Sequence, residues 1–181
     1  SGQDSGESGG TVKVLGEKVG LFAGTEIDVS GDAGGGEVLV GGNFQGKGPE
    51  PNAERTYVAS AASIHADALT GGDGGKVIVW ADGDTQYQGH ISANGGETGG
   101  DAGFVEISGK KNLGFAGTVD INTRGGQPGT LLLDPENIVI VDGAGAPDDD
   151  ELNDGEILAG DSPGATFTIS ESALEGLPAQ S

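Results

Sequence analysis

Short apolar segments bounded by glycine recur along the chain. The first set comprises GTVKVLG from Gly10, GEVLVGG from Gly36, GKVIVWA from Gly75, GFVEISG from Gly103 and GTLLLDP from Gly129. Each apolar segment is four to six residues long and follows a period of two, which is typical of a β-strand and not of a helix. The pattern therefore predicts at least five short strands with glycine at their ends.

A second set of segments follows the first four members of the first set. It comprises IDVSG from Ile27, IHADA from Ile64, ISANG from Ile91 and VDINT from Val119, preceded in turn by the aromatic residues Phe22, Tyr57, Tyr87 and Phe115. The starting positions of the first set are separated by steps of 26, 39, 28 and 26 residues, and those of the second set by 37, 27 and 28 residues. Two independent markers thus share one repeat.

This repeat predicts an all-β fold, a parallel β-helix with coils of about 27 residues. Glycine-rich corners fit a parallel β-helix, because glycine allows the backbone to turn where a Cβ would not fit. An up-and-down sandwich is the rival architecture, but the in-phase repeat favours the solenoid. The residues predicted to point inward are Val12, Val14, Val38, Val40, Val77, Val79, Val105, Ile107, Leu131 and Leu133 in the first strands, and Ile27, Val29, Ile64, Ala66, Ile91, Ala93, Val119 and Ile121 in the second.

The residues between the inward positions are expected to face outward. They are Lys13, Leu39, Ile78, Glu106 and Leu132, with Leu15 and Trp80 one step further along. Leu39, Ile78 and Trp80 would form an apolar stripe, and such patches indicate a partner or a covering element. The longest step contains an insertion at residues 46–56, marked as a surface loop by two prolines. Either this insertion covers the stripe, or the three residues are partner contacts.

The regular pattern divides the chain into two parts. Residues 1–141 are expected to form the parallel β-helix coils, with the insertion loop at 46–56. Residues 142–181 are expected to form an acidic loop and an irregular further coil, in which a strand resumes at Thr166–Ser170.

Composition and charge narrow the function. The 181 residues include 38 glycines and only 34% hydrophobic residues, which predicts a thin core. The net charge of -21 argues against binding nucleic acid through its phosphates and fits an extracellular protein. There is no cysteine, and no apolar run approaches the roughly 20 residues of a membrane-spanning helix.

The stretch GGDAGFVEISGKKNLGFAGTVDINTRGGQPGTLLLDPENIVIV, residues 99–141, resembles the filamentous-haemagglutinin family of large bacterial exoproteins. The most specific part is the run GTVDINTRGGQPGTLLLDPENI, and TISESALEGL downstream is also similar to the family. The resemblance implies a right-handed parallel β-helix, export through an outer-membrane two-partner secretion transporter and display at the bacterial cell surface. The Asn-Pro-Asn motifs of the family's secretion domain do not occur here, so we expect an internal or distal segment.

Catalytic signatures are not found in the sequence. His65 and His90 occupy outward positions of the repeat and are expected to be solvated surface side chains. No G-x-S-x-G elbow or phosphate-binding loop occurs, and we expect no enzyme activity.

Calcium is the one cofactor that the sequence suggests. DELNDGEILAGD, residues 150–161, places Asp150, Asp154 and Asp161 at positions 1, 5 and 12 of a calcium-loop pattern. Leu152 occupies the third position, where an oxygen ligand is expected, so a solvated acidic loop is the alternative.

These observations predict a structural segment, a rigid rod that displays contact surfaces to a host or neighbouring-cell glycan or protein. The first alternative is a subunit that self-associates into an extracellular fibre, because the ends of a β-helix expose unpaired strands. The second alternative is a carbohydrate-binding or carbohydrate-cleaving β-helix.

Overall fold

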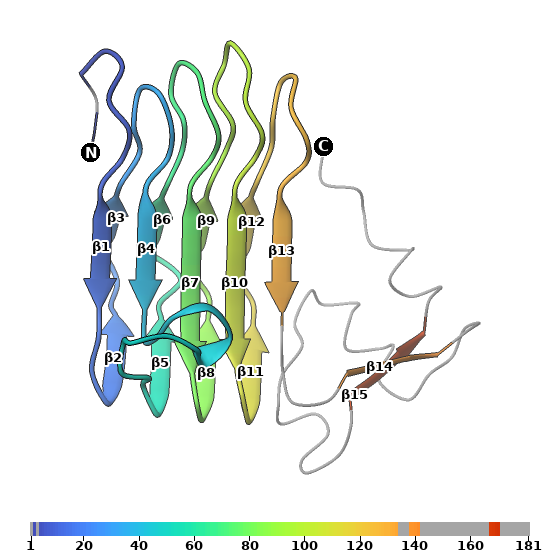
Figure 1. The fold of residues 1–181 in the computed structure, drawn as a ribbon. Coiled ribbons are helices and arrows are strands. Elements are labelled where there is room, and N and C mark those ends of the chain that lie inside the picture. Colours follow the sequence, from blue (N-terminus) through green and yellow to red (C-terminus); the bar gives the residue numbers. More distant parts are fainter. Residues whose placement is uncertain (1, 3, 134–137, 142–166, 171–181) are drawn as a thin grey trace.

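The computed structural model describes residues 2, 4–133, 138–141 and 167–170. Among them, parallel sheets stack as a β-solenoid of about four turns with about 28 residues per turn. The strands of the first sheet run downward at the front of Figure 1, the chain returns behind them, and successive coils advance to the right. This winding is right-handed, and the predicted parallel β-helix is confirmed.

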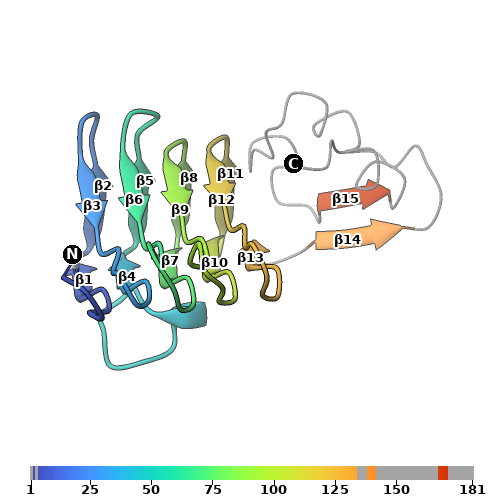
Figure 2. The same ribbon diagram turned by 90° about the horizontal axis from the view of Figure 1, so that it is seen from above.

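Three parallel sheets form the faces of the solenoid (Figures 1 and 2). The first contains β1 (Thr11–Val14), β4 (Glu37–Val40), β7 (Lys76–Ala81), β10 (Phe104–Gly109) and β13 (Thr130–Leu133). The second contains β2 (Lys18–Leu21), β5 (Arg55–Val58), β8 (Asp84–Tyr87) and β11 (Asn112–Phe115). The third contains β3 (Glu26–Asp28), β6 (Ser63–His65), β9 (His90–Ser92) and β12 (Thr118–Asp120).

Two further elements complete the described structure. A single 3-10 turn, η1 (Phe44–Gly46), lies in the connection between β4 and β5. β14 (Ile138–Val141) pairs in parallel with β15 (Phe167–Ser170), so the strand predicted near Thr166–Ser170 is confirmed. Within the described residues, no helix is both long enough and apolar enough to span a membrane.

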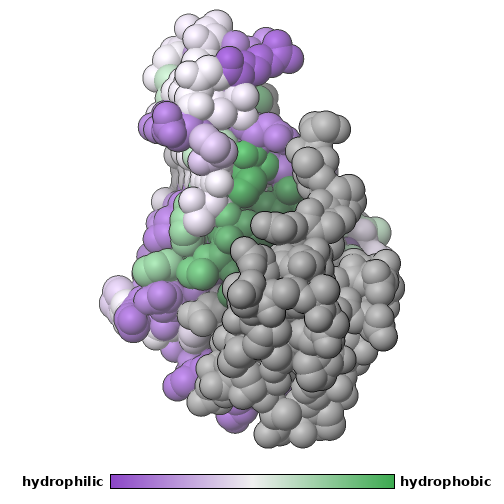
Figure 3. Space-filling view, turned by 90° about the vertical axis from the view of Figure 1, so that its right-hand side faces the viewer, coloured by the Kyte–Doolittle hydropathy of each residue, from purple (hydrophilic) through white to green (hydrophobic). Residues whose placement is uncertain are grey.

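The core is a column of aliphatic side chains in register from coil to coil. Val38 is the pairing partner of Val77, and Val77 is the partner of Val105. All three side chains are fully buried. The predicted inward residues belong to this core or pack against it, with one exception: Leu131 is 37% exposed, because β13 is the edge strand of its sheet. Figure 3 shows apolar side chains gathered at this end of the solenoid.

The four aromatic residues that precede the second-set segments do not all lie on the same face of the second sheet. Tyr87 and Phe115 share one inward row, and their rings stack with centroids 5.4 Å apart. Phe22 and Tyr57 are instead exposed at the outer surface. The aromatic marker is therefore not one structural position, because the inward row of this sheet is filled by Leu21 and Val58 in the first two coils.

Acidic and amide side chains join successive coils at the corners. Asp67 Oδ1 accepts a hydrogen bond from the backbone N–H of Asn94 at 2.7 Å, and Asn94 Oδ1 accepts one from the N–H of Asn122 at 2.8 Å. Asp73 Oδ1 accepts from the N–H of Asp101 in the same way. These side chains satisfy corner N–H groups that no strand pairs, so part of the acidic composition has a structural use.

Candidate functional site

The connection between β4 and β5 folds over the outer face of the first sheet. We call residues 41–54, which include η1, the strap; in Figure 1 it crosses the front of the solenoid. Beneath it lie Leu39, Ile78 and Trp80, which are 1%, 0% and 5% exposed and form a second apolar cluster with Phe104. The three residues predicted as partner contacts are therefore covered from within the chain, and the internal alternative is the one observed.

The covering residues begin earlier than the predicted insertion at 46–56. A Cβ built on Gly42 would lie 2.7 Å from the Trp80 indole, and one built on Gly46 would lie 2.6 Å from it. The Phe44 ring meets the Phe104 ring edge-on, with centroids 5.6 Å apart. Glycine at both positions lets the strap backbone lie directly on the indole, a close approach that the two prolines do not signal.

Polar contacts anchor the strap to several coils. Lys13 Nζ, in the first coil, donates to Glu50 Oε1 at 2.6 Å, and Asn43 Nδ2 donates to the other oxygen of Glu50 at 2.6 Å. These two donors lower the pKa of the Glu50 carboxyl to about 2, and Glu50 in turn raises the pKa of Lys13. The carboxylate form of Glu50 is thus the form that holds the strap.

The strap reaches the fourth coil through a buried carboxylate. Glu106 is fully buried, and both its oxygens lie within 3.2 Å of the Gln45 backbone N, which donates to them. Gln45 adopts a φ of 53°, in the left-handed region that non-glycine residues seldom enter. Glu106 lies on the outer face of the sheet, as the repeat predicts. Its burial leaves no mark in the repeat, because the covering residues come from two coils away.

A pocket of about 530 Å³ lies between the strap and the end of the first sheet. Its lining includes Trp80, Asp82, Asn52, Lys47 and Lys110. The Trp80 Nε1–H and the Asn52 side-chain amide both donate to Asp82 Oδ1, at 3.0 and 3.1 Å. These bonds fix the indole under the strap.

The two histidines lie on the outer face of the third sheet, as predicted, but they are hydrogen-bonded and half-buried. Their rings are neighbours, with centroids 5.8 Å apart. His65 Nδ1 lies 2.8 Å from Ser92 Oγ, and Ser92 Oγ donates to Asp67 Oδ2 at 2.6 Å. Because the hydroxyl proton of Ser92 is directed to Asp67, His65 faces the oxygen as a donor, which is the reverse of a serine–histidine pair that activates a nucleophile.

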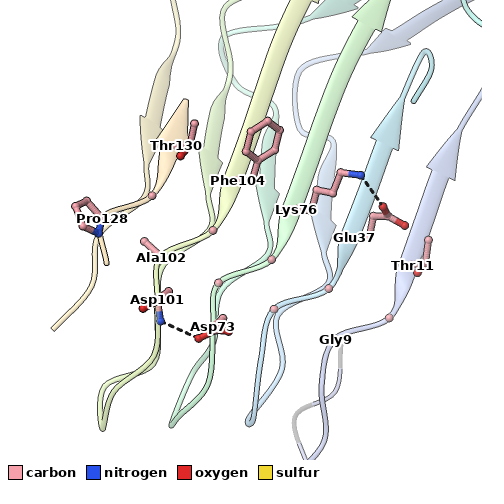
Figure 4. A pocket seen from close by; sticks show the side chains of 17 residues that line it. Gly9, Thr11, Glu37, Asp73, Lys76, Asp101, Ala102, Phe104, Pro128 and Thr130 are labelled. Atoms are coloured by element: carbon pink, nitrogen blue, oxygen red, sulfur yellow. Dashed lines mark hydrogen bonds and ion pairs between the residues drawn. The ribbon is translucent and has the colours of Figure 1, made fainter. Parts of the chain in front are cut away.

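A shallow groove of about 600 Å³ follows the corner before the first sheet (Figure 4). Its floor is mainly paired glycines of successive coils, and its walls carry Asp73 and Asp101 on one side and Glu37, Lys76 and Phe104 on the other. Lys76 Nζ lies 3.4 Å from Glu37 Oε1. The glycines are required by stacking, since a Cβ on Gly75 would lie 2.1 Å from the carbonyl oxygen of Gly36 in the preceding coil.

The candidate calcium ligands Asp150, Asp154 and Asp161 lie outside the described residues, so the calcium site stays a prediction. Among the residues that the structure does describe, no group of three or more histidine or acidic side chains is arranged to hold a metal ion.

The chain was compared with known protein families and with curated proteins, and neither comparison found a match.

Proposed function

We propose that the chain is a structural segment of a secreted, cell-surface filamentous exoprotein of the filamentous-haemagglutinin type. In this proposal its role is mechanical: it forms a rigid rod that holds contact surfaces away from the cell. An outer-membrane two-partner secretion transporter exports the protein, as the resemblance of residues 99–141 implies.

The observation that carries the proposal is the parallel, in-register pairing of successive coils in all three sheets. From the third coil to the fourth, Lys76 pairs with Phe104, Asp84 with Asn112 and His90 with Thr118, which is one step of 28 residues in all three sheets. Hydrogen bonds between the strands of successive coils therefore run along the solenoid axis on three sides. Such a structure resists bending and stretching along that axis, because extension must break many backbone bonds together.

Localisation tests the proposal on the native protein. Antibodies raised against residues 4–133 should label intact cells of the source bacterium, and deletion of the candidate transporter should abolish this labelling. Labelling that requires cell lysis, or that survives deletion of the transporter, would contradict surface display by this route.

A second candidate function is supported by the ends of the solenoid. Within the part of the chain that the structure describes, β1 and β13 are the edge strands of the first sheet, and the inward residues Val12 and Val14 of β1 are only half-buried. Edge strands with apolar residues beside them can pair with another chain. A self-assembling fibre subunit would form end-to-end polymers in sedimentation experiments, more readily at high salt, which screens the charge of -21. A monomer at every salt and protein concentration would reject this candidate.

A further inference from the structure

Two aromatic side chains lie side by side on the outer face of the second sheet. Phe22, directly after β2, is 69% exposed, and Tyr57 in β5 is 39% exposed. Their ring centroids are 6.2 Å apart and their planes are inclined at 47°. We call these two residues the aromatic pair. Because β2 and β5 are held in register by their backbone bonds, the pair is in place before any ligand binds.

Packing does not explain the aromatic pair. The outward row that contains Tyr57 reads Gly20, Tyr57, Gln86 and Gly114 from coil to coil, so the fold is compatible with glycine or glutamine there. The core beneath is filled by other residues of the same strands, including Leu21 and Val58. A Phe ring left in water forgoes the free energy of burial, so adjacent exposed rings indicate a binding surface.

The local backbone holds the Phe22 ring against the sheet. A Cβ built on Gly20 would lie 3.0 Å from the tip of the Phe22 ring, so the ring rests over the space that glycine leaves. One side of the ring is supported by the strand, and the remainder faces solvent. The pair therefore offers a nearly continuous apolar surface of two rings.

Polar side chains lie beside the aromatic pair in β2 and β5 and in the next two strands of the sheet, β8 and β11. Arg55 Nε lies 3.2 Å from Asp84 Oδ2, and Asn112 Nδ2 donates to Asp84 Oδ1 at 2.6 Å. Lys18 pairs with Arg55 in the same outward row. This row supplies hydrogen-bond donors and acceptors beside the rings, which is the combination that positions a ligand having both apolar faces and hydroxyl groups.

Charge restricts the ligand further. The net charge of -21 repels polyanions. The Asp84 carboxylate in the neighbouring row is already bonded to Arg55 and Asn112, so it does not select a lysine or arginine side chain of a partner protein. An uncharged ligand that presents C–H groups to aromatic rings and hydroxyls to polar neighbours meets both conditions, and carbohydrates have this chemistry.

We propose that the aromatic pair is a binding site for an uncharged saccharide. Pyranose rings stack on Phe22 and Tyr57, and their hydroxyl groups bond to Arg55, Asp84 and Gln86. The proposal does not depend on secretion or display of the chain, so it can fail or succeed independently of the function proposed above.

Affinity electrophoresis of the full chain in native gels tests this site. The gels contain a neutral β-glucan, mannan or galactan, or anionic polygalacturonate as the charged comparison. At least one neutral polysaccharide should retard the chain. Phe22→Ala and Tyr57→Ala should each weaken the binding about tenfold, since each removes a stacking face. Tyr57→Phe, which keeps the ring, should retain most of the retardation.

The control is Leu69→Ala, which truncates a side chain that is 42% exposed and outside the aromatic pair. It should migrate as the unmodified chain does, and circular dichroism should show that all variants keep their β structure. Absence of retardation by every neutral polysaccharide overturns the proposal. So does retardation of Phe22→Ala and Tyr57→Ala that equals that of the unmodified chain, or stronger retardation by polygalacturonate than by any neutral polymer.

Discussion

Lys13 Nζ lies 2.6 Å from a carboxylate oxygen of Glu50, although one residue belongs to the first coil and the other to the strap inserted in the second. This contact ties the strap to a strand that it does not follow in sequence. The Glu50 side chain is only 9% exposed, so the pair is more sheltered than an ordinary surface ion pair.

The pH dependence of this contact follows from the lowered pKa of Glu50. The pKa falls from 4.5 to about 2 in the folded chain, so the carboxylate stabilises the fold fully above about pH 4.5. That stabilisation is lost as the pH falls from about 4.5 to about 2. We expect Glu50→Gln to lower the unfolding midpoint at neutral pH, and the difference from the unmodified chain to vanish near pH 2. Denaturant unfolding at a series of pH values measures this; a difference that does not depend on pH would contradict it.

Trp80 reports directly on the strap, because it is the only tryptophan of the chain and it lies under residues 41–54. Gly46 has a φ of +63°, and a Cβ there would lie 2.6 Å from the indole. Gly46→Ala should therefore lift the strap and shift the tryptophan emission to longer wavelength. Gly24→Ala is a matched control, since Gly24 has a φ of +84° with nothing within 4 Å of the added Cβ. An unchanged emission spectrum in Gly46→Ala would show that the strap does not rest on the indole.

The glycine corners provide a second matched pair. Gly75→Ala places a Cβ 2.1 Å from the Gly36 carbonyl oxygen, whereas Gly10→Ala meets nothing within 4 Å. We expect Gly75→Ala to cost about 1–3 kcal/mol in the free energy of unfolding, as other overpacked sites do. Gly10→Ala should change it by less than about 0.5 kcal/mol, like most surface substitutions. Equal costs in urea unfolding would mean that stacking does not exclude a side chain at Gly75.

Tyr87 should resist ionisation as long as the chain is folded. Burial raises the pKa of its hydroxyl, with a smaller contribution from Asp120, and its O–H donates to the Thr118 carbonyl at 2.9 Å. The unfolded chain ionises near the ordinary value of 10.0, so the stability contributed by Tyr87 is present below that pH and is lost as the pH rises above it. The tyrosinate absorbance of the unmodified chain and of Tyr87→Phe is measured as the pH rises. The difference between the two, which reports Tyr87, should appear only when the chain unfolds. Its appearance while circular dichroism still shows the native fold would disprove this.

Calcium binding by the acidic segment can be tested without structural assumptions. Isothermal titration of the chain with calcium should show one site that is absent in a variant with Asp150, Asp154 and Asp161 all changed to asparagine. A second variant, with Asp4, Asp32 and Asp82 changed to asparagine, loses the same charge and serves as the control. Identical titrations of the two variants would reject a calcium loop at residues 150–161.

The sequence was sufficient to predict the solenoid because its signal is local and repeated. Glycine at Gly36, Gly75 and Gly103 marks the same corner of successive coils, and the valines that follow fall into register in the structure. The strap, by contrast, depends on contacts between residues far apart in the chain. The Gln45 contact with Glu106 joins positions 61 residues apart, and no periodic pattern encodes such a pair.

The sequence does not reveal the aromatic pair, for a different reason. Tyr57 and Tyr87 both precede a second-set segment, by seven and four residues, yet one faces water and the other the core. The step from Arg55 to Asp84 in the second sheet is 29 residues, and that from Ser63 to His90 in the third is 27. This two-residue difference alone would leave the face unchanged. The face is reversed because Val58, and not Tyr57, pairs with Tyr87, so the two tyrosines are one position out of register. The shift becomes visible only when the middle strands are paired.

The shared spacing of the last two complete coils has a consequence for chain length. Because β7 and β10, β8 and β11, and β9 and β12 are each offset by 28 residues, excision of residues 76–103 would join Gly75 to Phe104 with every remaining strand facing an equivalent neighbour. Duplication of the same block would lengthen the molecule by one rise of about 4.8 Å and keep the pairing register of all three sheets. Such a molecule can change its reach by gain or loss of whole modules, while its cross-section stays constant.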